Sequence, residues 1–454
     1  MYCKNIWTNA SEDKKEKIFS FCEGYKTFLT DSKTERDAVS ASLEILKKEG
    51  FVDLYSLKEI KPGDKVYAVN KNKNILACVI GDKPIEEGMR ILGAHIDSPR
   101  LDIKQNPLYE KCGFALLNTH YYGGIKKYQY VTIPLAIHGV VYKKNGEKVD
   151  INIGEDENDP MISVNDLLIH LSAAQIKKPA MEVIDGEDLD ITVGNIPLKD
   201  DKSGEVKNYL LELIKNKYGI EEEDFVSSDL CAVPAIKAKD YGLDRSMIAG
   251  YGHDDKVCAY TSLMAIVDQG KCEYTTMAVL VDKEEVGSIG ATGAQSKWFE
   301  NVVAELLFKQ GNESFLAIRH AMEKSKMLSS DVSAAVDPLY PSVNDMNNSC
   351  YFSKGIVINK YTGSAGKRGA NDAMPEFIAF VRKVFDENDI YYQSSELGKV
   401  DAGGGGTIAY ILGNYNMEVL DAGVAVLSMH SPMEIVSKAD VYETYLAYRA
   451  FIRY

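Results

Sequence analysis

Residues 279–290 read VLVDKEEVGSIG, and in this stretch the pair Glu284–Glu285 closely follows an apolar run, TMAVLV at residues 276–281. The run lacks polar alternation, which predicts a strand buried on both faces, as in a largely parallel sheet. Carboxylates so close to a buried strand cost free energy unless they are paired or bind a cation. Gly287 and Gly290 allow the backbone to turn after the strand. The stretch therefore predicts a functional site at the end of a buried strand.

Other segments extend the same pattern along the chain. Apolar runs of strand length occur at residues 90–95 (RILGAH) and 423–430 (GVAVLSMH). Apolar residues recur at helical spacing in residues 254–270 and 377–385. Alternating strands and helices predict an α/β domain with a mostly parallel central sheet.

The stretch from about residue 99 to 229 has a different pattern. It contains short alternating segments, such as YVTIPLAIHGVVYKK at 130–144, followed by a turn sequence at Asn145–Gly146. We interpret residues 99–229 as an inserted β-rich domain, which divides the α/β domain into residues 1–98 and 230–454.

Composition limits the possible functions. The chain has 454 residues and a net charge of −15, which favours neither nucleic acid nor an anionic membrane as a partner. Its eight cysteines form no CxxC pattern, as expected for reduced thiols. The amino terminus has no apolar signal core, and no run of about 18 apolar residues occurs. We expect a soluble, cytoplasmic protein.

Side chains able to bind metal gather where the predicted strands end or a helix begins. They are His95, Asp97, Asp254, Glu284, Glu285, Asp331 and His430. In open α/β sheets, functional groups meet beyond the carboxyl ends of the strands. Imidazole and carboxylate together suit zinc, cobalt or manganese, and a two-metal site needs roughly five protein ligands with one bridging carboxylate. A further carboxylate would then serve as general base.

Each of these residues also has a purely structural interpretation. Asp254 and Asp255 fit a helix cap with a first-turn acid, and Asp331 fits a turn. His430 fits a core histidine bonded to backbone, and the glutamate pair fits a solvated face. Their joint occurrence favours the metal site.

Seven motifs, taken in order, resemble those of the aspartyl-aminopeptidase family of dinuclear zinc metalloaminopeptidases. They are GAHIDSPRL (93–101), YYGGI (121–125), LLIHL (167–171), DDKVCAYTSL (254–263), DKEEVGSIGATGAQS (282–296), SSDVSAAVDPLYP (329–341) and LDAGVAVLSMHS (420–431). The resemblance implies a three-layer zinc-exopeptidase-like catalytic domain and removal of amino-terminal residues from peptides.

The resemblance also implies roles for the site residues. Asp254 would bridge two ions, most simply Zn²⁺ with Co²⁺ or Mn²⁺ as alternatives. His95 and Asp331 would complete the coordination of one ion, and Glu285 and His430 would complete that of the other. Asp97 would orient His95, and Glu284 would be the general base toward a water that bridges the two ions.

The resemblance further implies an assembly. Residues 99–229 would pair protomers within a tetrahedral dodecamer, and His170 would reach a neighbouring subunit's site.

The substrate contacts are expected in a glycine stretch whose backbone can come close to a ligand. Its residues are Gly403, Gly404, Gly405 and Gly406. Acid-specific members carry an Arg-Asn-Asp-Thr type stretch before this turn, whereas this chain reads GKVDAGGGGTIAYIL at 398–412. Lys360, Lys367 and Lys399 are candidate carboxylate partners that also fit a solvated surface. We therefore predict that neutral or basic amino-terminal residues are preferred over acidic ones.

Two rival functions remain open. The first is a dinuclear metal amidase or deacylase that acts on non-peptide amides and needs no free α-amine. The second is a catalytically silent, shell-forming scaffold with the same fold, which the complete set of ligands and base disfavours.

Overall fold

The computed structural model describes residues 4–199 and 205–454, which form two compact units. The first unit comprises the chain up to Ser98, Lys237–Met429 and Met433–Tyr454, and the second comprises Pro99–Ile236 with His430–Pro432. Within the described residues no helix is both long and apolar enough to cross a membrane. The seven cysteines in this part of the chain are free thiols, while Cys3 lies outside the described residues.

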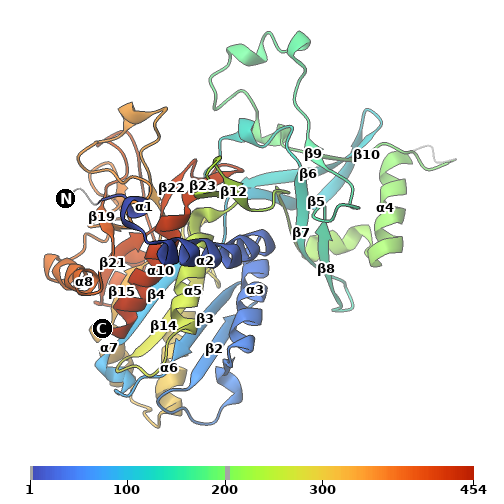
Figure 1. Ribbon diagram of the computed structural model, residues 1–454. Coiled ribbons are helices and arrows are strands. Elements are labelled where there is room, and N and C mark those ends of the chain that lie inside the picture. Colours follow the sequence, from blue (N-terminus) through green and yellow to red (C-terminus); the bar gives the residue numbers. More distant parts are fainter. Residues whose placement is uncertain (1–3, 200–204) are drawn as a thin grey trace. The chain divides into compact units, whose positions relative to one another are not determined.

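A nine-stranded mixed sheet forms the centre of the first unit (Figure 1). Its strands, in spatial order, are β1 (Val52–Asp53), β2 (Lys65–Asn70), β3 (Asn74–Val79), β14 (Thr275–Val281), β4 (Met89–His95), β15 (Lys326–Ser329), β21 (Glu418–Gly423), β17 (Ile356–Asn359) and β19 (Tyr392–Ser394). The four strands from β14 to β21 are parallel, and antiparallel pairs occur on either side of them. The predicted strands at 276–281 and 90–95 are therefore confirmed as β14 and β4.

Helices cover both faces of this sheet, which makes a three-layer unit. On β14, Ala278 and Leu280 pack into one core, whereas Met277 and Val279 pack into the other. The first core includes side chains of α2 (Glu12–Asp31), α3 (Glu35–Lys48), α5 (His253–Val267), α8 (Pro375–Glu387) and α10 (Lys438–Arg453). The second includes side chains of α6 (Trp298–Lys309), α7 (Phe315–Lys324) and α9 (Ala409–Gly413). The short helix α1 (Ile6–Asn9) precedes α2. Burial on both faces explains the uninterrupted apolar run in β14.

The run at 423–430 is not one strand, and this prediction was wrong. The chain leaves the large sheet after β21 and enters a second, five-stranded sheet as β22 (Ala425–Leu427). The other strands of that sheet are β12 (Lys239–Tyr241), β13 (Met247–Gly250), β23 (Glu434–Ser437) and β16 (Ser333–Ala334). Gly423 lies where a Cβ would overlap the carbonyl oxygen of Asp331. Periodicity does not reveal such a change of sheet, because apolar residues continue through it.

The second unit is built on a seven-stranded antiparallel sheet. Its strands, in order, are β8 (Lys148–Ile153), β7 (Leu135–Tyr142), β11 (Ser228–Pro234), β5 (Arg100–Lys111), β6 (Phe114–Tyr122), β10 (Ile191–Gly194) and β9 (Ser163–Val164), with helix α4 (Glu205–Tyr218) beside them in the same core. The predicted turn joins β7 to β8, with Gly146 at φ +87° and the Asn145 side chain accepting the Glu147 N–H. Strand β11 continues past residue 229, where the sequence predicts the insertion to end. In the first unit, a two-stranded ribbon of β18 (Gly363–Ser364) and β20 (Gly404–Gly405) completes the sheets.

Candidate metal centre

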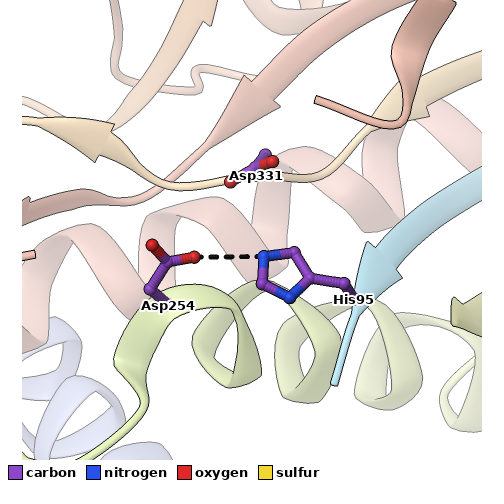
Figure 2. A group of neighbouring side chains, drawn as sticks. All are labelled: His95, Asp254 and Asp331. Carbon is purple, nitrogen blue, oxygen red and sulfur yellow. Dashed lines mark hydrogen bonds and ion pairs between the residues drawn. The ribbon is translucent and has the colours of Figure 1, made fainter. Parts of the chain in front are cut away.

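Three predicted ligands meet at the carboxyl ends of neighbouring parallel strands in the first unit (Figure 2). His95 is the last residue of β4, Asp331 follows β15 by two residues, and Asp254 lies at the start of α5. One ligand atom from each lies within 4.8 Å of the other two, and His95 Nε2 is 3.1 Å from Asp254 Oδ1. Asp254 and Asp255 have non-helical φ and ψ, so Asp254 is not an ordinary first-turn acid.

The electrostatics of this cluster favour a bound cation. Burial raises the pKa of Asp331 well above its usual value, and repulsion from Asp255 adds to this effect. Burial opposes a charge on His95, but its contacts with Asp254 and Asp97 raise its pKa well above the ordinary value. His95 and Asp254 are buried and Asp331 is half-buried, and a cluster of one imidazole nitrogen and two carboxylates that attracts positive charge fits the ligand set of zinc.

Asp97 connects this cluster to the glutamate pair. Its two carboxylate oxygens accept the backbone N–H groups of Glu284, at 3.1 Å, and of Glu285, at 3.2 Å. The same carboxylate lies 3.3 Å from His95 Nδ1. Lys283 at φ +70° and Gly287 at φ +96° turn the chain on either side of the pair. The two glutamates are thus held by the residue that contacts the free ring nitrogen of His95.

The two glutamate side chains are half-buried. Glu284 Oε2 is 3.9 Å from His95 Nε2. Its carboxylate therefore lies beside the three clustered ligands, although Glu284 is not one of them. The assignment of Glu285 as ligand and Glu284 as base remains a prediction.

His430 belongs to the second unit, although it follows β22 of the first unit by only three residues along the chain. Its Nδ1 lies 2.9 Å from the carbonyl oxygen of Gly124, which belongs to the YYGGI motif. This contact gives that motif a structural role that its sequence alone does not reveal. The assignment of His430 to an ion with Glu285 stays a prediction.

The other predicted site residues lie on exposed segments. His170 lies in the single turn Ile169–Leu171 of the second unit. Lys367, Lys399 and Asp401 line one pocket beside the β18–β20 ribbon, whereas Lys360 lines a different pocket with Arg382. Their roles toward substrate remain predictions.

The four glycines of the predicted substrate stretch are not equivalent in the structure. Gly404 and Gly405 form β20, while Gly403 precedes that strand and Gly406 follows it, and all four are exposed. Only Gly404 needs to be glycine for a close approach, because it has φ +141° and a Cβ there would lie 2.4 Å from the carbonyl oxygen of Gly363.

At Gly403 and Gly406 the contacts within the protein do not require glycine. A Cβ would find its nearest neighbour at 3.8 Å for Gly403 and 3.9 Å for Gly406, which is ordinary van der Waals contact. Gly403 lines the same pocket as Lys399, but Gly406 is not part of its lining. The packing explains glycine at Gly404 and gives no such reason at Gly403, Gly405 or Gly406, and the substrate role of all four stays a prediction.

Sequence reasoning missed several buried residues around the ligands. Asp255, interpreted only as a capping acid, accepts the backbone N–H of His95 at 3.3 Å. Ser98 and Glu434 form hydrogen bonds with the main chain of Asp254, and Lys256 donates to Ser98. Ser98 and Lys256 lie inside recognised motifs, which was the available signal, whereas Glu434 gave none.

The fold and the cluster define a class: an α/β metallohydrolase whose metal site lies at the carboxyl ends of parallel strands. Comparison with known proteins gives the family. The profile described as "Aminopeptidase I zinc metalloprotease (M18)" matches residues 28–452. The chain belongs to this family, and it is a zinc-dependent aminopeptidase.

Relatives and solved structures agree over the full length. A probable M18 family aminopeptidase 1 of Clostridium acetobutylicum is 53% identical over 99% of this chain and 98% of its own length. The crystal structure of aminopeptidase I from that organism covers 100% of both chains, with a TM-score of 0.93 and 51% identity. The M18 aminopeptidase structure from Thermotoga maritima gives a TM-score of 0.97 at 42% identity, covering 100% of this chain and 99% of that one.

Proposed function

We propose that this aminopeptidase works with two divalent ions and with Glu284 as general base. The observation that carries the proposal is the Asp97 carboxylate, which contacts His95 Nδ1 and accepts both glutamate N–H groups. A catalytic base must lie within reach of the water it activates, and Asp97 anchors Glu284 beside the clustered ligands.

The proposed ligand allocation follows the family resemblance. His95 and Asp331 hold one ion, Glu285 and His430 hold the other, and Asp254 lies between them. When bound, such ions lower the pKa of a coordinated water and polarise the peptide carbonyl. Zinc fits this mixture of imidazole and carboxylate, and Co²⁺ or Mn²⁺ fit the same ligands.

Glu284 supplies the proton transfers. One of its carboxylate oxygens accepts a proton as water attacks the carbonyl carbon, and the same group returns it to the leaving nitrogen as the C–N bond breaks. Asp97 fixes the backbone of Glu284, so the base is positioned before substrate arrives.

We also propose that neutral or basic amino-terminal residues are preferred. An acidic side chain needs a paired cation when it loses water. The pocket beside β20 contains Lys367 and Lys399, but Lys367 is already paired with Asp372 at 3.2 Å. Glu396 and Asp401 line the same pocket and would repel a carboxylate.

The second unit is proposed to pair protomers within an oligomer. His170 is surrounded in sequence by exposed apolar side chains, with Ile169 70% and Leu171 69% exposed, which is unusual for a face left in water. A yeast mApe1 dodecamer shares the fold, with a TM-score of 0.77 at 21% identity. We propose a comparable dodecamer here, with His170 reaching a neighbouring site.

One comparison separates an aminopeptidase from a deacylase. Leucine p-nitroanilide and its N-acetyl form differ only in the free α-amine. We expect zinc-loaded protein to cleave the first compound alone, and the release of p-nitroaniline measures this cleavage. Equal release of p-nitroaniline from both would favour an amidase or deacylase that needs no free α-amine, and release from neither by fully metal-loaded protein would favour a silent scaffold.

A further inference from the structure

The main chain of Asp254 is held by buried side chains on both sides. Its N–H donates to Glu434 Oε2 at 3.0 Å, and its carbonyl oxygen accepts a hydrogen bond from Ser98 Oγ at 2.7 Å. Lys256 Nζ in turn donates to Ser98 Oγ at 2.6 Å. Ser98, Lys256 and Glu434 are each no more than 1% exposed. Asp254 lies at the start of α5, where a backbone N–H has no acceptor within the helix, so the bond to Glu434 satisfies that group.

The charges in this arrangement match the peptide dipole. The N–H of Asp254 faces a carboxylate, and its carbonyl oxygen faces a hydroxyl that itself accepts a hydrogen bond from an ammonium group. Hydrogen bonds that involve ionised groups are roughly twice as strong as neutral ones, and burial strengthens them further. The arrangement therefore resists rotation of the peptide groups that set the direction of the Asp254 side chain.

Gly252 provides the space that this network needs. A Cβ at Gly252 would lie 2.7 Å from Lys256 Nζ and 2.8 Å from Ser98 Oγ. The residue also has φ +77°, a conformation that favours glycine. The local sequence is thus fitted to a hydrogen bond between Lys256 and Ser98.

We infer that Ser98, Lys256 and Glu434 are positioning residues that fix the Asp254 carboxylate and so set the affinity of the centre for zinc. The inference rests on the proposed function, since it takes Asp254 as the ligand shared by both ions. Residues that orient metal ligands from outside typically change metal affinity or activity by about 10–100-fold when replaced.

The test is zinc retention by the zinc-loaded protein. Wild type, Ser98→Ala, Lys256→Met and Glu434→Gln are titrated with a competing chelator, and the zinc left on the protein is measured. We expect the variants to lose zinc at free-zinc levels about 10–100-fold higher than wild type. Thermal unfolding of the same samples is recorded, so that a general loss of stability is seen separately.

Lys438→Met is the matched control. Lys438 is also fully buried, but its ion pair is with Asp240, at 2.8 Å, rather than with a residue that holds Asp254. We expect this variant to lower the unfolding temperature while zinc retention stays at the wild-type level. If Lys256→Met does not fold, Ser98→Ala, which removes a single hydroxyl, decides the question.

The outcomes separate the two proposals. Suppose that Ser98→Ala and Glu434→Gln retain zinc as wild type does, and only their unfolding temperature falls, as in the Lys438→Met control. That result would overturn the positioning role and leave the proposed metal centre standing. If Asp254→Ala and His95→Ala also retained zinc like wild type, the metal centre itself would be wrong, and the inference would fall with it.

Discussion

Neighbouring residues can take different roles when a third residue fixes their backbone. Glu284 and Glu285 share one anchor, because each donates its N–H to a different oxygen of Asp97. The positive φ of Lys283 and Gly287 confines the turn between them to a short segment. Their side chains are then free to differ, as the proposed roles of Glu285 in metal binding and Glu284 in proton transfer require.

Glu284→Gln tests this division at the level of one atom. Glutamine keeps the size of the side chain but cannot accept the proton, so we predict a fall in kcat of about 10²–10⁴-fold with zinc content unchanged. Steady-state kinetics and metal analysis on the same preparation provide the measurement. Loss of one zinc per subunit in this variant would reverse the roles assigned to Glu284 and Glu285.

Strand ends explain how much of the site could be predicted from the sequence. The strands β14 and β4 could be predicted because both of their faces are apolar. Their predicted ends then marked His95 and the residues just after β14 as candidate site residues. Residues that reach the site from the other sheet could not be predicted. Glu434 lies in β23 of the smaller sheet, and only the folded chain brings it to the N–H of Asp254. Local periodicity contains no information on such long-range contacts.

The glycine stretch shows the same limit at the scale of one short strand. Four successive glycines look alike in the sequence, and Gly404 and Gly405 both pair with β18, yet only at Gly404 would a Cβ overlap the backbone of that strand. Gly403, Gly405 and Gly406 have room for a Cβ. Which glycine a ribbon requires depends on the strand it pairs with, and that partner is distant in the sequence.

A long-range contact also fixes the segment that follows the glycine stretch. Thr407 Oγ1 donates to Asp421 Oδ1 at 2.7 Å, which ties the residue after the glycines to strand β21. Burial raises the pKa of Asp421 to about 6, so the folded protein holds its proton more tightly than the unfolded chain does. Between the unfolded pKa of about 3.9 and the folded value, the contribution of Asp421 to stability falls as pH rises.

Asp421→Asn removes this titration while keeping an oxygen for Thr407. We predict that the variant gains stability relative to wild type as pH rises from about 4 to 7, by about 3 kcal/mol at most. Urea unfolding of both proteins at each pH measures the difference, in which the other titrating groups cancel. A difference that does not change with pH would mean that the carboxyl titrates normally in the fold.

At the scale of the whole molecule, the assembly proposal makes activity depend on more than one chain. His170→Ala should lower turnover without loss of zinc, because His170 is assigned to a neighbouring subunit's site. Mixing this variant with Asp331→Ala, under conditions in which subunits exchange, should restore part of the activity. Sites built from two intact contributions then form in mixed assemblies. Proven exchange without any restoration would count against the shared site.

The net charge of the molecule acts on the substrate together with the pocket beside β20. A charge of −15 attracts cationic peptides and repels anionic ones at long range, and this effect is screened by salt. A pocket preference acts at short range and is less sensitive to salt. Salt dependence therefore separates the two sources of specificity.

We predict that lysyl and leucyl p-nitroanilides are cleaved with higher kcat/KM than the aspartyl compound, at equal zinc and salt. Raising the salt should lower kcat/KM for the lysyl substrate relative to the leucyl one, because the two differ in charge. It should leave leucyl ahead of aspartyl, because Glu396 and Asp401 act within the pocket. An aspartyl value ten times the others, equal to about 1.4 kcal/mol in transition-state binding, would instead show that a fixed cation serves the acidic side chain. Lys399→Met would then identify that cation by its loss of aspartyl cleavage, with Lys360→Met, from the other pocket, as the matched control.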